Sequence, residues 1–208
     1  MRLVKITILL AIAAFGSVSC SLYFREHFFL PGEAIPMDEL VGTWDLQEQK
    51  DESGHADDEQ TKLIFFSPAG GTIDCLMQRI QRKGRNVDNL PFVGKAYGLA
   101  GKKFLLAWEN DAQSVDGKKV RKLSEECNIF HYLVKGDTLV LYGLNKEKFE
   151  KLVSGGKLEG HARGGGGYDR RTFHITSPGP KVRSAVLEAG IDGLIELDKP
   201  TEFRRTGK

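Results

Sequence analysis

The sequence predicts a mostly β protein: an antiparallel barrel or barrel-like folded sheet of about eight strands with two short helices. Short apolar runs of strand length recur along the chain, turn residues separate them, and long helical periodicity is scarce. Runs in meander order favour a barrel, because closure removes the exposed edges of an open sheet. The expected strands are residues 42–46, 62–66, 71–77, 103–108, 128–134, 138–143, 171–176 and 202–205.

Two of the expected connections carry turn residues. Ser67-Pro68-Ala69-Gly70 joins the second and third runs, and Lys135-Gly136-Asp137 joins the fifth and sixth, so both pairs are expected to form hairpins. Residues 78–101 form a long connection in this scheme. The basic cluster within it is expected to lie in a solvated loop and consists of Arg79, Arg82, Lys83 and Arg85.

Two segments carry helix signals. Residues 146–154 follow Asn145, a residue type that caps helix starts, and stop at Gly155. Residues 180–189 begin with a proline and end before Gly190. Each segment has an apolar face, so we expect both helices to pack against the sheet or to plug one end of it.

The chain begins with the three parts of a secretory signal. Two basic residues precede an apolar run of about ten residues, which is shorter than the roughly twenty that a spanning helix needs. Small residues then lead to Cys20, and residues 17–20, Ser-Val-Ser-Cys, resemble a bacterial lipobox. The resemblance implies a signal peptide at 1–19, a lipidated N-terminal tether at 20–39 that starts at Cys20, and a single β domain at 40–208.

Alternatives remain open at this end of the chain. Ser17 and Ser19 also suit the general signal peptidase, whose cleavage would give a secreted or periplasmic protein. Residues 22–30 are more apolar than the flexible polar tether that usually follows a lipidated cysteine. They could instead form a first strand or contact the membrane surface. Loss of Arg2 and Lys5 lowers the formal net charge by two, from +2 to zero. Because nucleic-acid binding needs a clustered positive surface, no nucleic-acid partner is expected.

The first expected strand of the domain carries Gly42-Thr43-Trp44, which resembles the opening of a lipocalin or calycin barrel. The resemblance implies that the tryptophan closes one barrel end under an arginine from the last strand, Arg204 or Arg205, in a cation–π contact. It also implies that the barrel interior binds a lipid or another small apolar ligand. The expected cavity lining consists of Phe65, Phe104, Leu106, Phe130, Leu139 and Leu141.

The remaining reactive residue types form no known catalytic or metal-binding motif. If Cys20 is lipidated, Cys75 and Cys127 can form a disulfide in an oxidising compartment, and two buried free thiols fit the sequence equally well. The chain has no paired zinc-ligand spacing and no Gly-x-Ser-x-Gly elbow. We therefore expect no metal, no cofactor and no enzymatic reaction, and a structural role for His131.

The glycine-rich segment 161–171 is the most unusual part of the sequence. A phosphate-binding loop needs a following Lys-Ser/Thr and a helix, whereas a strand is expected here, so we interpret the segment as a flexible connection. The alternative is a lid whose polar side chains engage a ligand or partner: His161, Arg163, Asp169 and Arg170.

The function that these features favour is that of a membrane-anchored envelope lipoprotein with a lipid or small apolar ligand in its barrel. The alternative is a non-enzymatic structural or interaction lipoprotein that docks on other envelope components. The expected partners are the membrane, through the lipid on Cys20, a small apolar ligand and an envelope protein.

Overall fold

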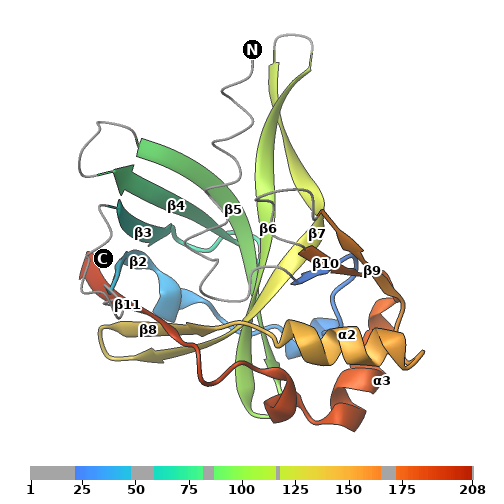
Figure 1. Ribbon diagram of the computed structural model, residues 1–208. Coiled ribbons are helices and arrows are strands. Elements are labelled where there is room, and N and C mark those ends of the chain that lie inside the picture. Colours follow the sequence, from blue (N-terminus) through green and yellow to red (C-terminus); the bar gives the residue numbers. More distant parts are fainter. Residues whose placement is uncertain (1–21, 48–58, 82–86, 116–117, 165–171, 208) are drawn as a thin grey trace.

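The computed structural model describes residues 22–47, 59–81, 87–115, 118–164 and 172–207. Its centre is a closed antiparallel barrel of eight strands (Figure 1). Seven strands follow one another as a meander, and the last strand closes the barrel by pairing with both β8 and β2. The barrel strands are β2 (Gly42–Leu46), β3 (Glu59–Phe65), β4 (Ile73–Gln81), β5 (Val87–Leu99), β6 (Lys102–Val115), β7 (Lys118–Lys135), β8 (Thr138–Tyr142) and β11 (Thr201–Gly207).

A second, smaller sheet continues from the barrel wall at β7. It consists of β1 (Leu22–Phe24), β10 (Thr172–Ile175) and β9 (Gly160–Arg163), in that order outward. β1 meets β7 at the pair Phe24 and Cys127, and it runs parallel to β10. We call these three strands the side sheet. β9 is its outermost strand (Figure 1).

Two α-helices lie where the sequence predicts them. α2 (Lys146–Ser154) starts at Asn145, whose side chain accepts a hydrogen bond of 3.0 Å from the Lys148 amide. α3 (Gly179–Ala189) ends at Gly190, which has a φ of 79° that favours glycine. Three short 3₁₀ helices complete the fold: η1 (Pro31–Glu33), η2 (Asp38–Leu40) and η3 (Ile191–Leu194). Among the described residues, no helix is both long enough and apolar enough to span a membrane.

The barrel wall separates two hydrophobic cores. Leu105 and Tyr132 belong to the core inside the barrel, whereas the neighbouring residues Phe104 and Ile129 belong to a core outside it. The outer core also contains residues of both α-helices and of the side sheet. Because successive side chains of a strand alternate between the two faces, a wall covered on both sides buries nearly every residue of its central strands.

One barrel strand lies where the sequence predicts a long connection. β5 occupies residues 87–99 and pairs with β4 and β6. Its sequence contains Pro91, Gly94 and Gly98, which are typical of loops. Gly94 suits tight packing, because a Cβ there would lie 3.0 Å from Ile73 Cγ2 and 3.1 Å from Leu105 Cδ1. The expected strand at 171–176 does form, as β10, but it belongs to the side sheet.

The segment expected as a tether is part of the fold from Leu22 onward. Its aromatic residues lie in the outer core, where the Phe24 ring is 5.3 Å from Phe149 and the Phe29 ring is 5.0 Å from Tyr97. Such rings gain more from burial against the barrel wall than a solvated tether allows. The tether assignment is therefore wrong for residues 22–39, and the first-strand alternative is confirmed.

The basic cluster is also only partly a loop. Arg79 lies in β4, only 2% exposed, and alternation places it on the same side of the strand as Cys75 and Met77. It therefore points into the barrel, which contradicts the expectation of a solvated position. Arg82, Lys83 and Arg85 lie outside the described residues.

Candidate functional site

One end of the barrel is closed by Trp44 and its neighbours. The indole is fully buried, and its Nε1 donates a hydrogen bond of 2.7 Å to the Leu40 carbonyl in η2. The Arg205 guanidinium lies 4.2 Å from the centre of the indole ring, and its Nη2 donates to the Glu39 carbonyl at 2.7 Å. This is the cation–π pairing that the sequence predicts. Arg204 is exposed and pairs in register with Asp45.

Glu39 connects η2 to the barrel wall at the same end of the barrel. Its carboxylate forms an ion pair with Lys103 Nζ at 2.7 Å. The buried hydroxyl of Tyr132 is close by, and burial, with a smaller effect of Glu39, raises the pKa of Tyr132 above its usual range. These contacts fix η2 across the barrel end.

Described residues pack closely in the barrel interior, where they form the inner hydrophobic core. A cavity that they line there has a volume of about 20 Å³. That is room for about one water molecule. Its lining is apolar and consists of Leu63, Phe65, Cys75, Phe92, Gly94, Leu105, Ala107, Phe130 and Leu141.

Four of the six expected cavity residues lie on the inner side of the wall. Phe65, Phe130 and Leu141 line the cavity, and Leu139 belongs to the same inner core. Phe104 and Leu106 do not: they lie in the outer core. Alternation alone shows that these two share a face, but it cannot show which face is inside when both faces are covered.

The two cysteines do not form a disulfide. Both are buried free thiols, Cys75 in the inner core and Cys127 in the outer core, so the barrel wall separates them. Burial raises the pKa of the Cys127 thiol to about 12 and raises that of Cys75 as well, which makes both thiols poor nucleophiles at neutral pH. Cys20 lies outside the described residues.

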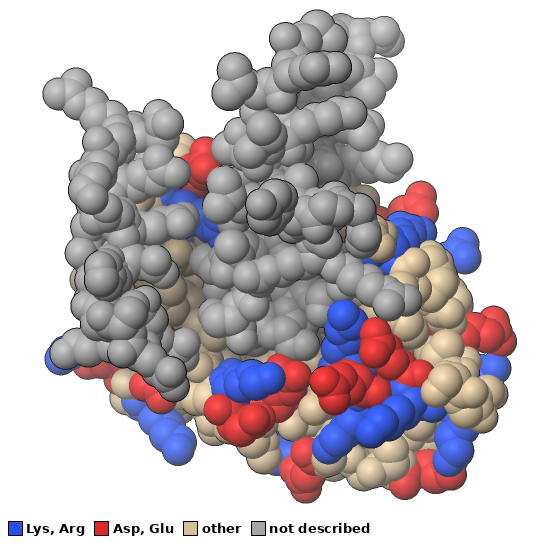
Figure 2. All heavy atoms as spheres, in the orientation of Figure 1, with Lys and Arg blue, Asp and Glu red and all other residues tan. Residues whose placement is uncertain are grey.

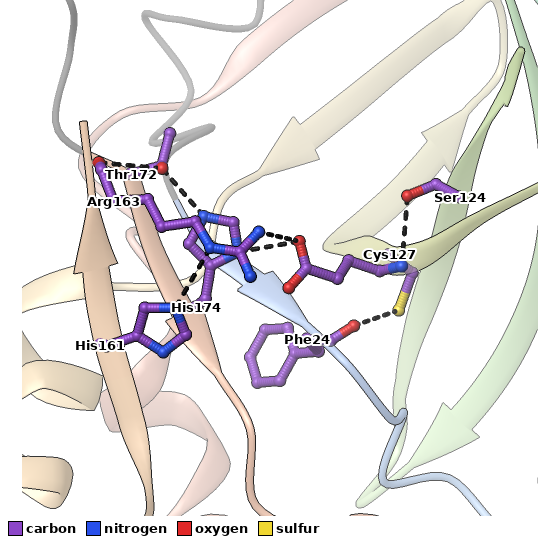
Figure 3. A network of polar contacts seen from close by, with 8 residues as sticks. Phe24, Ser124, Cys127, His161, Arg163, Thr172 and His174 are labelled. Atoms are coloured by element: carbon purple, nitrogen blue, oxygen red, sulfur yellow. Dashed lines mark hydrogen bonds and ion pairs between the residues drawn. The ribbon is translucent and has the colours of Figure 1, made fainter.

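A connected cluster of polar residues lies on the side sheet (Figure 3). Tyr23, His174 and His161 stand in register across β1, β10 and β9. Their rings form a ladder, with centres 5.0 Å apart for Tyr23 and His174 and 5.6 Å apart for His174 and His161. Cross-strand ring pairs of this kind stabilise a sheet.

Hydrogen bonds link this ladder to β7 and along the strands. His174 contacts Glu126 Oε2 through Nδ1 at 2.8 Å and Thr172 Oγ1 through Nε2 at 2.9 Å. Arg163 Nε donates to His161 Nε2 at 3.1 Å, and Arg163 Nη1 lies 3.7 Å from Glu126 Oε2 (Figure 3). We call these five residues with Tyr23 the side-sheet network.

The hydrogen-bond partners in the side-sheet network indicate which ring nitrogens of its two histidines carry a proton. The Glu126 carboxylate accepts, so His174 Nδ1 carries a proton, and His161 Nε2 is unprotonated because it accepts from Arg163. The Thr172 hydroxyl donates to the Arg163 carbonyl at 3.2 Å, and its oxygen lies 2.9 Å from His174 Nε2. Both ring nitrogens of buried His174 are thus occupied, whereas His161 and Arg163 are exposed at the sheet edge.

The sequence identifies only part of this network. His161 and Arg163 belong to the glycine-rich segment, while Asp169 and Arg170 of the expected lid lie outside the described residues. Tyr23, Glu126, Thr172 and His174 carry no local signal, because strands far apart in the chain bring them together. His131 has a separate position in the barrel wall, where Nδ1 contacts the Lys103 carbonyl at 2.8 Å.

No group of three or more His, Cys, Asp or Glu residues in the described ranges is arranged to hold a metal ion. In comparisons with known proteins, the chain matches no family model, no curated protein and no solved structure. Its function must therefore be argued from the geometry above.

Proposed function

We propose that this protein is a non-enzymatic envelope lipoprotein that docks on other proteins, with the barrel serving as a rigid scaffold. The observation that carries the proposal is the small volume of the apolar cavity that described residues line inside the barrel. Ligand sites for small molecules usually have about 300 Å³ or more. The cavity here has about 20 Å³, so a bound acyl chain would have to displace core side chains.

The folded N-terminal segment supports a short anchor in this proposal. β1 starts at Leu22, two residues after Cys20. Two residues span at most about 7 Å, so a lipid on Cys20 would hold the domain directly at the membrane surface. Two acyl chains are sufficient for stable anchoring.

The charge distribution favours docking through specific contacts. On the face shown in Figure 2, acidic and basic side chains are interspersed over the described part of the surface. A partner on that face would therefore be recognised by local pairs of charges and hydrogen bonds more than by a single-sign field.

The anchor is tested by expressing the full chain in a bacterium that processes lipoproteins. We expect the protein in the membrane fraction, with a mature N-terminal peptide whose mass includes the acyl chains, and loss of that modification in Cys20→Ser. An unmodified peptide beginning at Cys20 or elsewhere would remove the lipoprotein part of the proposal and leave the docking part to be tested separately.

Binding of a small apolar ligand is the second candidate, because the cavity lining is apolar throughout. Native mass spectrometry of residues 21–208 separates the two functions. We expect the bare polypeptide mass. A small-molecule adduct that disappears on denaturation would contradict the filled-scaffold proposal and establish a carrier.

A further inference from the structure

We propose that β9 is a self-association surface, at which two copies of this chain pair antiparallel about His161 and join their side sheets. The inference goes beyond the proposed docking function, because the partner that it names is a second copy of this chain. It does not depend on the lipid anchor. The contact would use the backbone, the charged side chains and the histidine ring of residues 159–163.

The backbone of β9 presents unpaired groups to solvent. Among the described strands, β9 is the last of the side sheet and has only β10 as a neighbour. The Glu159 carbonyl accepts from the Thr176 amide at 3.0 Å, so alternation turns the amides and carbonyls of Gly160 and Ala162 away from β10. No other described residue bonds to these groups. An antiparallel copy centred on His161 would pair Gly160 with Ala162 of the second copy, in four backbone hydrogen bonds.

The side chains of this segment are self-complementary in that register. Glu159, His161 and Arg163 alternate with the two small residues and share the other face of the strand. Pairing about His161 places Glu159 opposite Arg163 of the second copy, twice by symmetry. Opposite charges directly across an antiparallel pair are stabilising, and like charges are destabilising. A shift of pairing to Ala162 would oppose Arg163 with His161 and lose both ion pairs.

The ion pairs that Glu159 and Arg163 form within one copy leave both side chains able to contact a second copy. Glu159 forms an ion pair with Lys181 at 2.9 Å, and the two side chains are 67% and 43% exposed. The Arg163 side chain is 58% exposed, and its Nη1 is 3.7 Å from Glu126 Oε2. Exposed pairs of this kind contribute little, and a carboxylate can accept from more than one donor.

The ring ladder would continue across the contact. His161 is the exposed end of the Tyr23, His174 and His161 ladder. In a two-fold pairing, the His161 rings of both copies would face each other in a non-hydrogen-bonded pair, the closer of the two pair types. On the opposite face the two strands bring together Gly160 and Ala162, which are both small residues.

A charge exchange tests the register directly in residues 21–208, which contain every described residue. We expect the unmodified chain to dimerise reversibly in sedimentation equilibrium over a concentration series. Arg163→Glu opposes two carboxylates, and Glu159→Arg opposes two guanidinium groups, so each should weaken the dimer about tenfold or more. Arg204→Glu, an exposed charge reversal on β11, should leave it unchanged.

The two weakened variants should repair each other. Mixed in equal amounts, Arg163→Glu and Glu159→Arg place opposite charges at both positions, so native mass spectrometry should show a heterodimer in preference to either homodimer. The double variant E159R/R163E should restore the homodimer. The inference is overturned if the unmodified chain stays monomeric, if the single variants dimerise as well as the unmodified chain, or if the mixture forms no preferred heterodimer.

A covalent trap tests the two-fold centre. His161→Cys places two thiols at a non-hydrogen-bonded pair, where Cα atoms are about 4.5 Å apart, within the range that a disulfide bridges. Oxidation should give a cross-linked dimer, and Arg204→Cys should not. Absence of the cross-link in a folded His161→Cys chain would count against this register. Failure of these tests would leave docking on another protein intact, because that function needs no second copy.

Discussion

The barrel and the side sheet differ in their edges: the barrel is closed, whereas the side sheet ends in the edge strand β9. Each barrel strand has a neighbour on both sides, and η2, Trp44 and Arg205 close one end. In the side sheet, β9 has one neighbour among the strands that the structure describes, and exposed polar residues lie on it. Closure removes edges, and a sheet added outside a barrel creates one again. We therefore look for stability in the barrel and for recognition at the side sheet.

The largest expected effect is at the barrel closure. Trp44→Ala should lower the free energy of unfolding by about 3–5 kcal/mol, because it removes a fully buried aromatic side chain and the surface on which Arg205 packs. Urea unfolding followed by circular dichroism measures the loss. Trp108→Ala, at a half-buried indole of the outer face, should cost clearly less. Equal losses at the two sites would show that the closure has no special role.

The side-sheet network should respond locally. Glu126→Ala leaves His174 Nδ1 without its acceptor, which should cost about 1–2 kcal/mol. We expect hydrogen exchange to quicken at β9 and β10 while the β3 and β4 amides keep their protection. Glu126→Gln, which retains an acceptor oxygen, serves as the milder control. If barrel amides lose protection to the same extent, the two regions unfold as one unit and the comparison fails.

A smaller effect is expected where only the shape of a cation changes. Arg205→Lys keeps the charge near Trp44 but loses the planar group that covers the ring and reaches the Glu39 carbonyl. The expected cost is about 0.5–1 kcal/mol. Arg204→Lys, on the exposed face of the same strand, should change the unfolding midpoint hardly at all. The closure argument loses its basis if the two substitutions cannot be distinguished.

The parts of the fold that the sequence predicts are those with local signals. Alternation, turn residues and caps locate most of the barrel strands and both helices, and Trp44 with a late arginine indicates the closure. The sequence does not predict β5, because Pro91 and Gly94 are typical of loops. Pairing with β4 and β6 holds these residues in a strand. Tertiary pairing overrides local preference there.

Local sequence signals predict even less of the side-sheet network. Tyr23, Glu126 and His174 lie together because β1 inserts between β7 and β10. No sequence pattern around any of the three residues predicts its contact with the other two. The same limit explains the wrong side assigned to Phe104 and Leu106. A strand pattern shows which side chains share a face, and the partner layers decide what that face contacts.

The smallest expected effect is a pH dependence of stability that comes from the barrel wall. Burial, with a smaller contribution from Lys102, lowers the pKa of His131 below the usual 6.5, and burial likewise lowers that of His27. Well above pH 6.5 both histidines are neutral in the folded and unfolded chain, so they add no pH dependence. As the pH falls through 6.5 the unfolded chain takes up protons first, and the free energy of unfolding should fall.

The slope from His131 cannot exceed about 1.4 kcal/mol per pH unit, since it reflects at most one proton. Urea unfolding at several pH values between 7.5 and 5.5 measures it, and His131→Gln should flatten it. The pKa of Glu33 is lowered by its hydrogen bond with Arg183, so that carboxylate loses its contribution only below its usual 4.5, outside this window. An unchanged slope in His131→Gln would mean that the wall at this position admits the charged ring, and that burial by the outer core is looser there than the packing against Tyr142 implies.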